Sequence, residues 1–583
     1  MAKKKDKTNW DKIEDEIKAM KPLTDRMDES KDFVYMKPFK LRDFANTHDL
    51  DNVINVTGNS PAVFANAIVS DLIAAKWQTV VEGNITPRQA HFIEMFVEDN
   101  FAQADETLYD KYGITSLYAW LCNHVCVRSL IGFRWLSLID GDQYNVECLP
   151  VDMRWTPYVR NNWVAPIYWR SPADLEAELE EFEKFAKEIE GGEYYDCEFT
   201  GSNDMEVREY WTPEVNELWI KKKKVFSQPN TLGMLPFVIV RPASGFMLKD
   251  KDYLGHDSED LFFLNRYLYK EMNRALSVEQ SLGMDVLFPP TEQEQDEFGS
   301  HPAQKPPKAG EVLAVRKGEM HKPVPRGDLN RASLTARTDI YKQIELGGIS
   351  DAELGSASLD RAGIWFAKQF EIRHKLERSR FEALAIAKAG AARMMIKQFL
   401  MSSDTDQELL VGRTGRKNKY SKEMLGDPDK YRISFKSMAS SKEMEIVNIA
   451  QAQAAKGTMP MKRIVTDIYQ AEDPAGWLAE LDLEKAKENN PAIALAEMAI
   501  RYAEEAEDMN DEIEADLKKT QSQILVHDYV MIMRQRMQPL PVEQASQKRT
   551  AEAKGANLQG LAAMPGLLGG NLQKNPVQEA ATQ

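Results

Sequence analysis

Three groups of residues have types and spacings that could support chemistry: a Cys/His cluster, pairs of carboxylates and a glycine-containing basic turn. The cluster is Cys122-Asn-His124-Val-Cys126, and thiolate and imidazole groups are the usual ligands of zinc. On a helix, residues four apart share a face, so Cys122 and Cys126 would lie together while His124 points away. A second ligand pair is missing from the sequence. We therefore interpret the cluster as buried packing and predict no metal site.

The carboxylate pairs could hold the metal ions of a two-metal nuclease. Asp257 stands close to Glu259 and Asp260, and Asp351 to Glu353. Such pairs are weak evidence in a chain with 91 Asp and Glu. The glycine-containing turn, Gly412-Arg-Thr-Gly-Arg-Lys417, lacks the spacing of a phosphate-binding loop and is interpreted as a turn with basic decoration. The motifs of zinc proteases and serine hydrolases do not occur either, so we predict no catalytic residue, no cofactor and no enzyme.

The composition describes the kind of chain that must position these residues. The chain has 583 residues, 43% of them hydrophobic, which suggests about three to five structural units with a true core. Its net charge of -17 argues against a protein that coats DNA through its whole surface. Four cysteines are too few for a disulfide scaffold and fit a reducing cytoplasm. The sequence predicts neither a signal peptide nor a membrane span.

The periodicity of apolar residues predicts an α+β fold that is mainly helical. Strands are predicted over 133–138, 144–149, 206–211, 217–225, 236–241, 311–316, 320–324 and within 408–436. Helices are predicted within 51–83 and over 87–99, 106–130, 171–190, 254–283, 329–346, 361–400 and 440–540. The Lys221–Lys224 run lies inside a predicted strand, where lysines could block aberrant edge pairing or contact nucleic acid.

The order of these parts resembles the portal (head-to-tail connector) proteins of tailed bacteriophages. The family's G-x-S start of the first stem helix resembles Gly255-His-Asp-Ser258, with one extra residue, and its following asparagine is matched by Asn265 or Asn273. The P-G-x-[VI] strand start of the family's clip resembles Lys308-Ala-Gly-Glu-Val312, where alanine replaces proline. The resemblance covers roughly residues 30–440. Each motif is weak alone, and their order carries the comparison.

The resemblance implies a ring subunit whose parts follow one another along the chain. An N-terminal arm (1–29) is followed by a wing (30–253), a first stem helix (254–284), a small α/β clip (285–328), a second stem helix (329–347), a tunnel loop (348–361), a long helix returning to the wing (362–440), a helical crown (441–540) and a flexible tail (541–583). Stem helices that pack against neighbouring subunits should be apolar on more than one face, as Leu261-Phe-Phe-Leu264 suggests.

The resemblance also assigns residues to the channel. Residues 349–360 of the tunnel loop contain acidic, small and polar side chains and no basic ones, so that this part would repel phosphate. The channel residues assigned here are Gly347, Gly348, Ser350, Asp351, Glu353, Gly355, Ser356, Ser358 and Asp360. The long helix after it carries nine basic against three acidic residues over 361–397. These charges could form salt bridges within the ring or contact packaged DNA, the candidates being Arg361, Lys368, Arg373 and Arg378. The clip would dock the packaging motor through Lys305, Lys308, Arg316 and Lys317.

The function implied by the resemblance is a channel at one capsid vertex for packaging and ejecting double-stranded DNA. The implied partners are further copies of the chain in a ring of twelve, the terminase large subunit, the major capsid and scaffolding proteins and head-completion or tail adaptor proteins. The implied location is the virion, after assembly in the host bacterial cytoplasm. Two alternatives stay open: a metal-dependent enzyme of nucleic acids such as a nuclease, and a non-viral helical scaffold.

Overall fold

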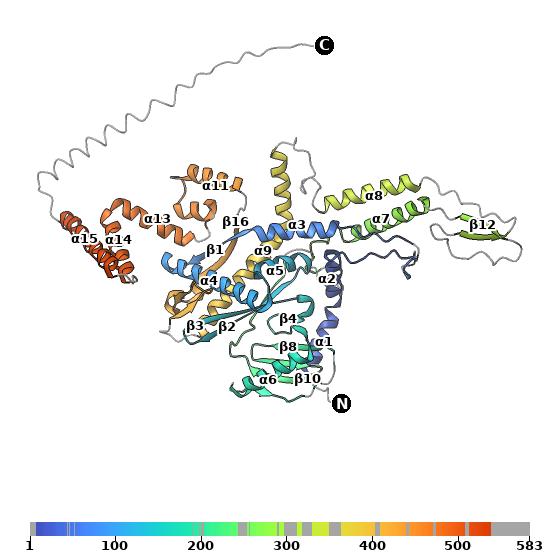
Figure 1. Cartoon of the computed structure of the whole chain (residues 1–583), viewed down its shortest axis with the longest axis horizontal. Helices are drawn as coiled ribbons and strands as arrows, with labels where there is room; N and C mark the ends of the chain where they lie inside the picture. The colour runs from blue at the N-terminus through green and yellow to red at the C-terminus, as the bar shows by residue number, and fades with distance from the viewer. Residues whose placement is uncertain are drawn as a thin grey trace, which may run out of the picture. The chain divides into compact units, whose positions relative to one another are not determined.

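The computed structural model describes residues 7–43, 45, 47–51, 53–188, 191–197, 199, 203–242, 253–255, 257–287, 291–295, 312–316, 329–348, 363–402, 408–438, 442–469, 471, 474–507 and 512–537. Of these residues 56% are helical and 20% lie in strands, which confirms a mainly helical α+β class. The chain divides into two compact units, Met1–Leu478 and Ala479–Gln583. Figure 1 shows the elements of both.

The first unit is built around a five-stranded sheet whose strands come from distant parts of the chain (Figure 1). The strand order is β11 (Phe237–Val240), β2 (Ile131–Asp140), β3 (Gln143–Val151), β14 (Leu409–Val411) and β15 (Asn418–Tyr420). The β2–β3 hairpin turns at Gly141-Asp142, with Gly141 at φ 64°. The helices α3 (Ser60–Ala74), α4 (Pro87–Tyr112), α5 (Leu117–Val127) and α9 (Gly363–Ser402) contribute to the same core. Its fully buried members include Phe96, Trp135 and Phe399.

A second sheet, of seven strands, lies between two helices. Its order is β4 (Tyr158–Val159), β5 (Trp163–Val164), β8 (Met205–Trp211), β9 (Val215–Ile220), β10 (Lys223–Pro229) and β7 (Glu193–Tyr194), with β6 (Ile167–Arg170) also paired to β8. The acidic helix α6 (Pro172–Glu188) packs on one face through Leu175. The amino-terminal helix α1 (Asn9–Ala19) packs on the other face through Trp10 and Ile13.

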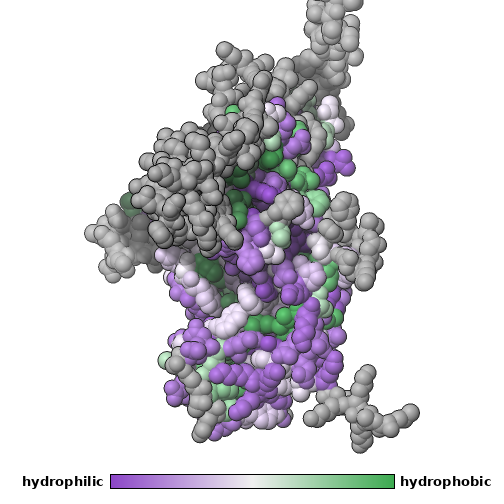
Figure 2. Space-filling view, turned by 90° about the vertical axis from the view of Figure 1, so that its right-hand side faces the viewer, coloured by the Kyte–Doolittle hydropathy of each residue, from purple (hydrophilic) through white to green (hydrophobic). Residues whose placement is uncertain are grey.

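The N-terminal segment, expected to be a loosely helical arm, is helical but packs on the body of the protein through buried residues of α1 and α2 (Lys21–Val34). The expected single strand over 217–225 is a hairpin, because Lys221 and Lys222 adopt left-handed backbone angles and form the turn between β9 and β10. In Figure 2 the lower part of the face, formed by this seven-stranded sheet and its helices, is mainly hydrophilic with isolated hydrophobic patches.

Two helices and a strand pair form the part that the sequence analysis assigned to the stem and clip. Helix α7 (Arg266–Leu287) begins twelve residues later than predicted, whereas α8 (Leu329–Leu346) ends where Gly347-Gly348 predicted. They are antiparallel, since Asn265 contacts Ile344 near one end and Glu279 pairs with Arg337 further along. In the chain segment that connects the two helices, β12 (Thr291–Gln295) pairs in parallel with β13 (Val312–Arg316). The strand predicted over 320–324 lies outside the described residues.

The region after 440 is helical, as predicted. It contains α11 (Lys442–Ala455), α12 (Met461–Arg463), the π-helical turn η4 (Ile464–Tyr469), α13 (Pro474–Asn489), α14 (Pro491–Glu507) and α15 (Glu512–Met537). Helices α14 and α15 pack on each other through small residues, and Ser522 donates a hydrogen bond of 2.7 Å to the carbonyl of Ala499. None of the helices within the described ranges is sufficiently long and apolar to cross a membrane.

A lysine is enclosed by aromatic rings where five elements of the first unit meet. The ammonium group of Lys388 on α9 lies 4.8–5.9 Å from the ring centres of Trp77, Phe101, Tyr118 and Phe435. Trp77 and Phe435 belong to the antiparallel pair β1 (Lys76–Gly83) and β16 (Tyr431–Met438). Burial lowers the pKa of Lys388 to about 8, against the opposing effects of Asp105, Cys122 and Glu98. Cation–π contacts with the rings recover part of this desolvation cost.

Replacing Lys388 by methionine should stabilise the protein most at neutral pH. Below about pH 8 both the folded and the unfolded chain keep the proton, so the wild type bears the full cost of burying the charge. Between pH 8 and the ordinary lysine value of 10.5 only the folded chain releases it, so wild-type stability rises relative to Lys388→Met. Thermal unfolding at pH 7 and pH 9.5 measures the difference. Lys397→Met, at an exposed site on the same helix, should show no such pH dependence.

Candidate functional site: the base of α7 and α8

One arginine of α2, Arg26, binds the backbone carbonyls of the segment that leads into α7. The guanidinium of Arg26 donates hydrogen bonds to the carbonyl oxygens of Gly255 (2.6 Å), Asp257 and Ser258 (3.0 Å). Ser258 is buried and has left-handed backbone (φ 56°), which is unusual for a residue other than glycine. Its hydroxyl lies 3.2 Å from that of Ser129, which itself donates to the carbonyl of Glu259. Gly255 and Ser258, which the sequence placed at the start of the first stem helix, are therefore part of one hydrogen-bond network around Arg26.

The carboxylates of this segment are neutralised by arginines. Asp257 pairs with Arg241, Glu259 lies 3.5 Å from Arg266 and 3.6 Å from Arg26, and Asp260 lies 2.7 Å from Arg266. Ser30 on α2 also donates to Asp260. Because each carboxylate faces a guanidinium, the group that the sequence analysis considered as a nuclease signal is an ion-pair network. This network attaches the start of α7 to α2.

Asn265, the residue immediately before α7, connects the start of α7 to the end of α8. Its side-chain amide donates a 2.9 Å hydrogen bond to the carbonyl of Ile344, and the side chain is buried. A Cβ atom on Gly347 would lie 2.3 Å from the Asn265 side-chain oxygen, and one on Gly348 would lie 3.0 Å from the Ile344 carbonyl. Only glycine fits at 347 while Asn265 keeps this position. The fold thus brings Asn265, Gly347 and Gly348 to one junction, and Gly255 and Ser258 lie in the segment that leads into it.

A ladder of side chains binds an extended strand along α7. The backbone N–H groups of Ile54, Val56 and Gly58 donate to Ser281, Ser277 and Asn273 at 2.8–2.9 Å. The acceptors are four residues apart and lie on one helix face, while alternate N–H groups of an extended chain point to one side. On the other side, Asn55 and Thr57 accept the N–H groups of Leu41 and Phe39. Of the helices predicted within 51–83, the first is therefore absent, and the second, expected to start at Ser60-Pro61, is α3. The prediction was also wrong at its end, because α3 stops at Ala74 and Lys76–Gly83 forms strand β1.

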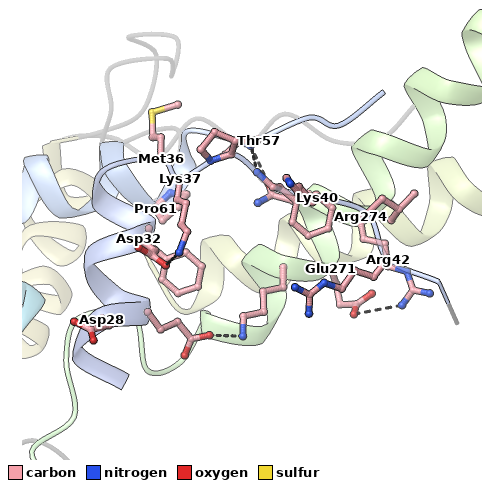
Figure 3. Close-up of a pocket in the computed structure, with 18 of the residues that line it drawn as sticks. Asp28, Asp32, Met36, Lys37, Lys40, Arg42, Thr57, Pro61, Glu271 and Arg274 are labelled. Carbon is pink, nitrogen blue, oxygen red and sulfur yellow. Dashed lines mark hydrogen bonds and ion pairs between the residues drawn. The ribbon is translucent and has the colours of Figure 1, made fainter. Parts of the chain in front are cut away.

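This layered segment forms one wall of a cleft of about 1140 Å³ (Figure 3). The opposite walls are α2, from Pro22 to Phe33, and the first turns of α7. Figure 3 shows side chains from all three converging on it. Each basic residue that lines the cleft contacts a carboxylate: Lys37 with Asp32, Lys40 and Arg42 with Asp49, Lys270 with Glu29, Arg274 with Glu271 and Arg26 with Glu259. The cleft is therefore close to charge balance and does not present a basic anion site.

Most of the residues predicted for the channel and the clip cannot be placed. Ser350, Asp351, Glu353, Gly355, Ser356, Ser358, Asp360, Arg361, Lys305, Lys308 and Lys317 lie outside the described residues. Lys368 and Arg373 are in α9 and Arg316 ends β13, but only their backbone is described. Arg378 is exposed and pairs with Glu382 at 3.0 Å, one turn along α9. The basic residues of α9 do not form one surface, because Arg380 is buried and Lys388 is enclosed by rings.

The two cysteines of the Cys/His cluster are buried, as the sequence predicted. Cys122 and Cys126 lie together in the core, and burial raises the pKa of each thiol to about 12. His124 stacks on Trp120 with ring centres 3.5 Å apart, and burial lowers its pKa to about 4. Within the described part of the chain, no three His, Cys, Asp or Glu side chains are grouped so that they could hold a metal ion.

The comparisons with known proteins add no relative. No protein-family model matches the sequence, and no curated protein matches it significantly.

Sequence reasoning missed the residues that hold the junction together. Arg26, Arg241 and Arg266 are isolated in sequence and became a group only through the fold. Ser277 and Ser281 carried a usable signal, because with Asn273 they repeat every four residues on one face of a predicted helix.

Gly347→Ala should destabilise the junction because the new methyl group collides with Asn265. We expect a loss of about 1–3 kcal/mol, typical of an overpacked buried site, in chemical denaturation. Asn265→Ala removes the colliding atoms, so the double variant should lose less than the sum of the two single variants. Gly283→Ala on α7 is the control, because a Cβ atom there meets nothing within 4 Å. Additive losses in the double variant would contradict the proposed contact.

Ser277→Ala should loosen the strand that lies along α7. The Val56 N–H loses its acceptor, and an unmade hydrogen bond at a partly buried site costs about 1 kcal/mol. Hydrogen–deuterium exchange should therefore be about five-fold faster over residues 54–58. Ser70→Ala, whose hydroxyl bonds only within α3, should leave this exchange rate unchanged.

Proposed function

We propose that this chain is a portal-type subunit, a structural protein that forms a ring at one vertex of a tailed-bacteriophage capsid. The observation that carries the proposal is the antiparallel pair α7–α8 and its base. The Gly255–Ser258 turn leads into α7, Gly347-Gly348 ends α8, and Asn265 joins the two. These are the positions at which the sequence resembles the family's stem. A short strand pair, β12–β13, is formed by the segment that connects the two helices, as a clip would be.

The apolar surface of the stem region supports assembly into a ring. Tyr267 is 75% exposed and Leu346 80% exposed, and Leu264, Leu334 and Tyr341 are also exposed in a single copy. Large apolar side chains grouped on one part of a soluble protein favour burial by a partner. In a ring, each copy would cover them with a different surface of its neighbour.

In this function the ring is a passage for double-stranded DNA and a platform for other proteins. The acidic balance of the chain suits a channel through which DNA slides without being held. We further propose that the terminase large subunit docks on the clip and that capsid, scaffolding and adaptor proteins surround the ring. The protein would reside in the virion after assembly in the bacterial cytoplasm.

The assembly state tests this function directly. Twelve copies of a 66.4 kDa chain have a mass of about 800 kDa, which light scattering would detect and negative-stain images would show as a ring with a central hole. Tyr267→Asp with Leu346→Asp should convert the ring to smaller species, since each charge would be buried at a subunit contact. Leu138→Asp is the control, because this leucine is 56% exposed on β2, away from the stem. A monomer with metal-dependent nuclease activity would contradict the proposal.

A further inference from the structure

The β14–β15 hairpin presents a compact group of basic side chains. Its six-residue loop runs from Gly412 to Lys417, and Lys419 follows in β15. Arg413, Arg416, Lys417 and Lys419 are all exposed. The loop contains no acidic residue, although the chain as a whole carries a net charge of -17. The local charge of the hairpin is therefore opposite to that of the protein.

The loop has a defined shape that holds these charges in place. Gly412 has φ 132° and Gly415 φ 81°, and a Cβ atom on Gly412 would lie 2.4 Å from the Arg416 carbonyl. The Arg416 N–H donates to the Arg413 carbonyl at 3.0 Å, which closes a turn. Glu106 on α4 accepts the N–H of Thr414 at 2.9 Å. Asp99, two turns earlier on the same face of α4, accepts from Asn418 and Tyr420.

These anchors occupy the carboxylates of Glu106 and Asp99, and in the described part of the chain two arginines of the loop have no ion pair. Glu408 lies 3.8 Å from Lys419, and Lys417 donates to the Gln143 side chain at 2.9 Å. Among the described residues, no carboxylate lies within ion-pair distance of Arg413 or Arg416. The β2–β3 turn brings exposed Asp140 and Asp142 to the same end of the sheet, where their charges partly offset the loop.

A second basic hairpin in the same chain shows the contrast. The β9–β10 turn carries Lys221–Lys224, but Lys222 lies 3.6 Å from Glu14, and Lys224 lies 3.8 Å from both Glu193 and Glu217. Lys223 is placed over the ring of Phe199. Lysines there are largely matched by their surroundings, as expected for a solvated turn. The 412–417 loop instead carries two arginines that have no ion pair with any described carboxylate.

We propose that the β14–β15 hairpin is a contact site for the phosphate backbone of double-stranded nucleic acid. Arginine presents a planar fork of donors that fits phosphate oxygens in a bidentate manner. Several fixed cations on one rigid loop suit the regular row of phosphates along a duplex, which would be bound without regard to sequence. The site is separate from the α9 and tunnel-loop residues assigned to the channel, and it does not require that the chain form a ring.

The test uses two triple variants of the full-length protein that change the net charge equally. One is Arg413→Glu, Arg416→Glu, Lys417→Glu, and the control is Lys221→Glu, Lys222→Glu, Lys223→Glu. Fluorescence anisotropy with a random-sequence duplex of DNA, and with one of RNA, is recorded from 50 to 200 mM NaCl. The hairpin variant should bind at least about ten-fold more weakly at 50 mM, with a salt dependence reduced by about two to three phosphate contacts. The control should change less than about two-fold, within the general effect of net charge.

A gain of affinity provides the opposite test. Asp140→Asn with Asp142→Asn should strengthen duplex binding several-fold, since it removes the carboxylates that partly offset the loop. Arg413→Gln with Arg416→Gln repeats the loss at a smaller change of charge, should the glutamate variant fail to fold. Equal losses in the two triple variants, no measurable duplex binding at 50 mM, or equally strong binding of polyglutamate would each overturn the proposal. Ring formation by these variants, seen in negative stain, reports on the proposed function separately.

Discussion

The burial of charge beneath α7 is the constraint on which the rest of the structure depends. Asp257, Glu259 and Asp260 are almost fully buried, and a buried carboxylate is tolerated only when it is paired. Arg26 and Arg266 meet this requirement only if α2, the turn before α7 and α7 itself keep their present positions. Removing one member of such a network leaves an uncompensated charge, at a cost of about 3–5 kcal/mol. The network therefore fixes where α7 begins and in which direction it leaves the body.

This constraint also explains which features the sequence could and could not predict. Local signals were sufficient at the end of α8, where two glycines stop the helix, at the β2–β3 turn and at the cap of α6, where Ser171 accepts the N–H of Asp174. The start of α7 was predicted too early because Leu261-Phe-Phe-Leu264 has helical spacing. In the fold Leu261 and Phe262 instead enter the core. Tertiary contacts there outweigh local propensity.

The candidate site was harder to predict than the fold, for the same physical reason. Two residues named through the resemblance, Ser258 and Gly347, lie at the base of α7 and of α8, but Arg26, which binds Ser258, is distant in sequence. The strand pairing of β12 was also missed, because Thr291–Gln295 has no apolar residue to alternate. The extended chain before α3 was missed because its hydrogen-bond acceptors are side chains of another helix. None of these partners is visible in a local window of sequence.

The ladder between α7 and the extended strand has a geometric consequence of its own. Two residues of extended chain advance about 6.6 Å, whereas four residues of helix advance about 6.0 Å and turn about 40° beyond a full circle. Because the two repeat lengths differ, the N–H groups of the extended chain and the acceptors on the helix stay aligned only over a short distance. Three rungs, at Asn273, Ser277 and Ser281, accumulate a mismatch of about 1.2 Å, which flexible side chains can absorb. Such a pairing is self-limiting in length: it can pin a strand to a helix at one place, but it cannot grow into a longer interface.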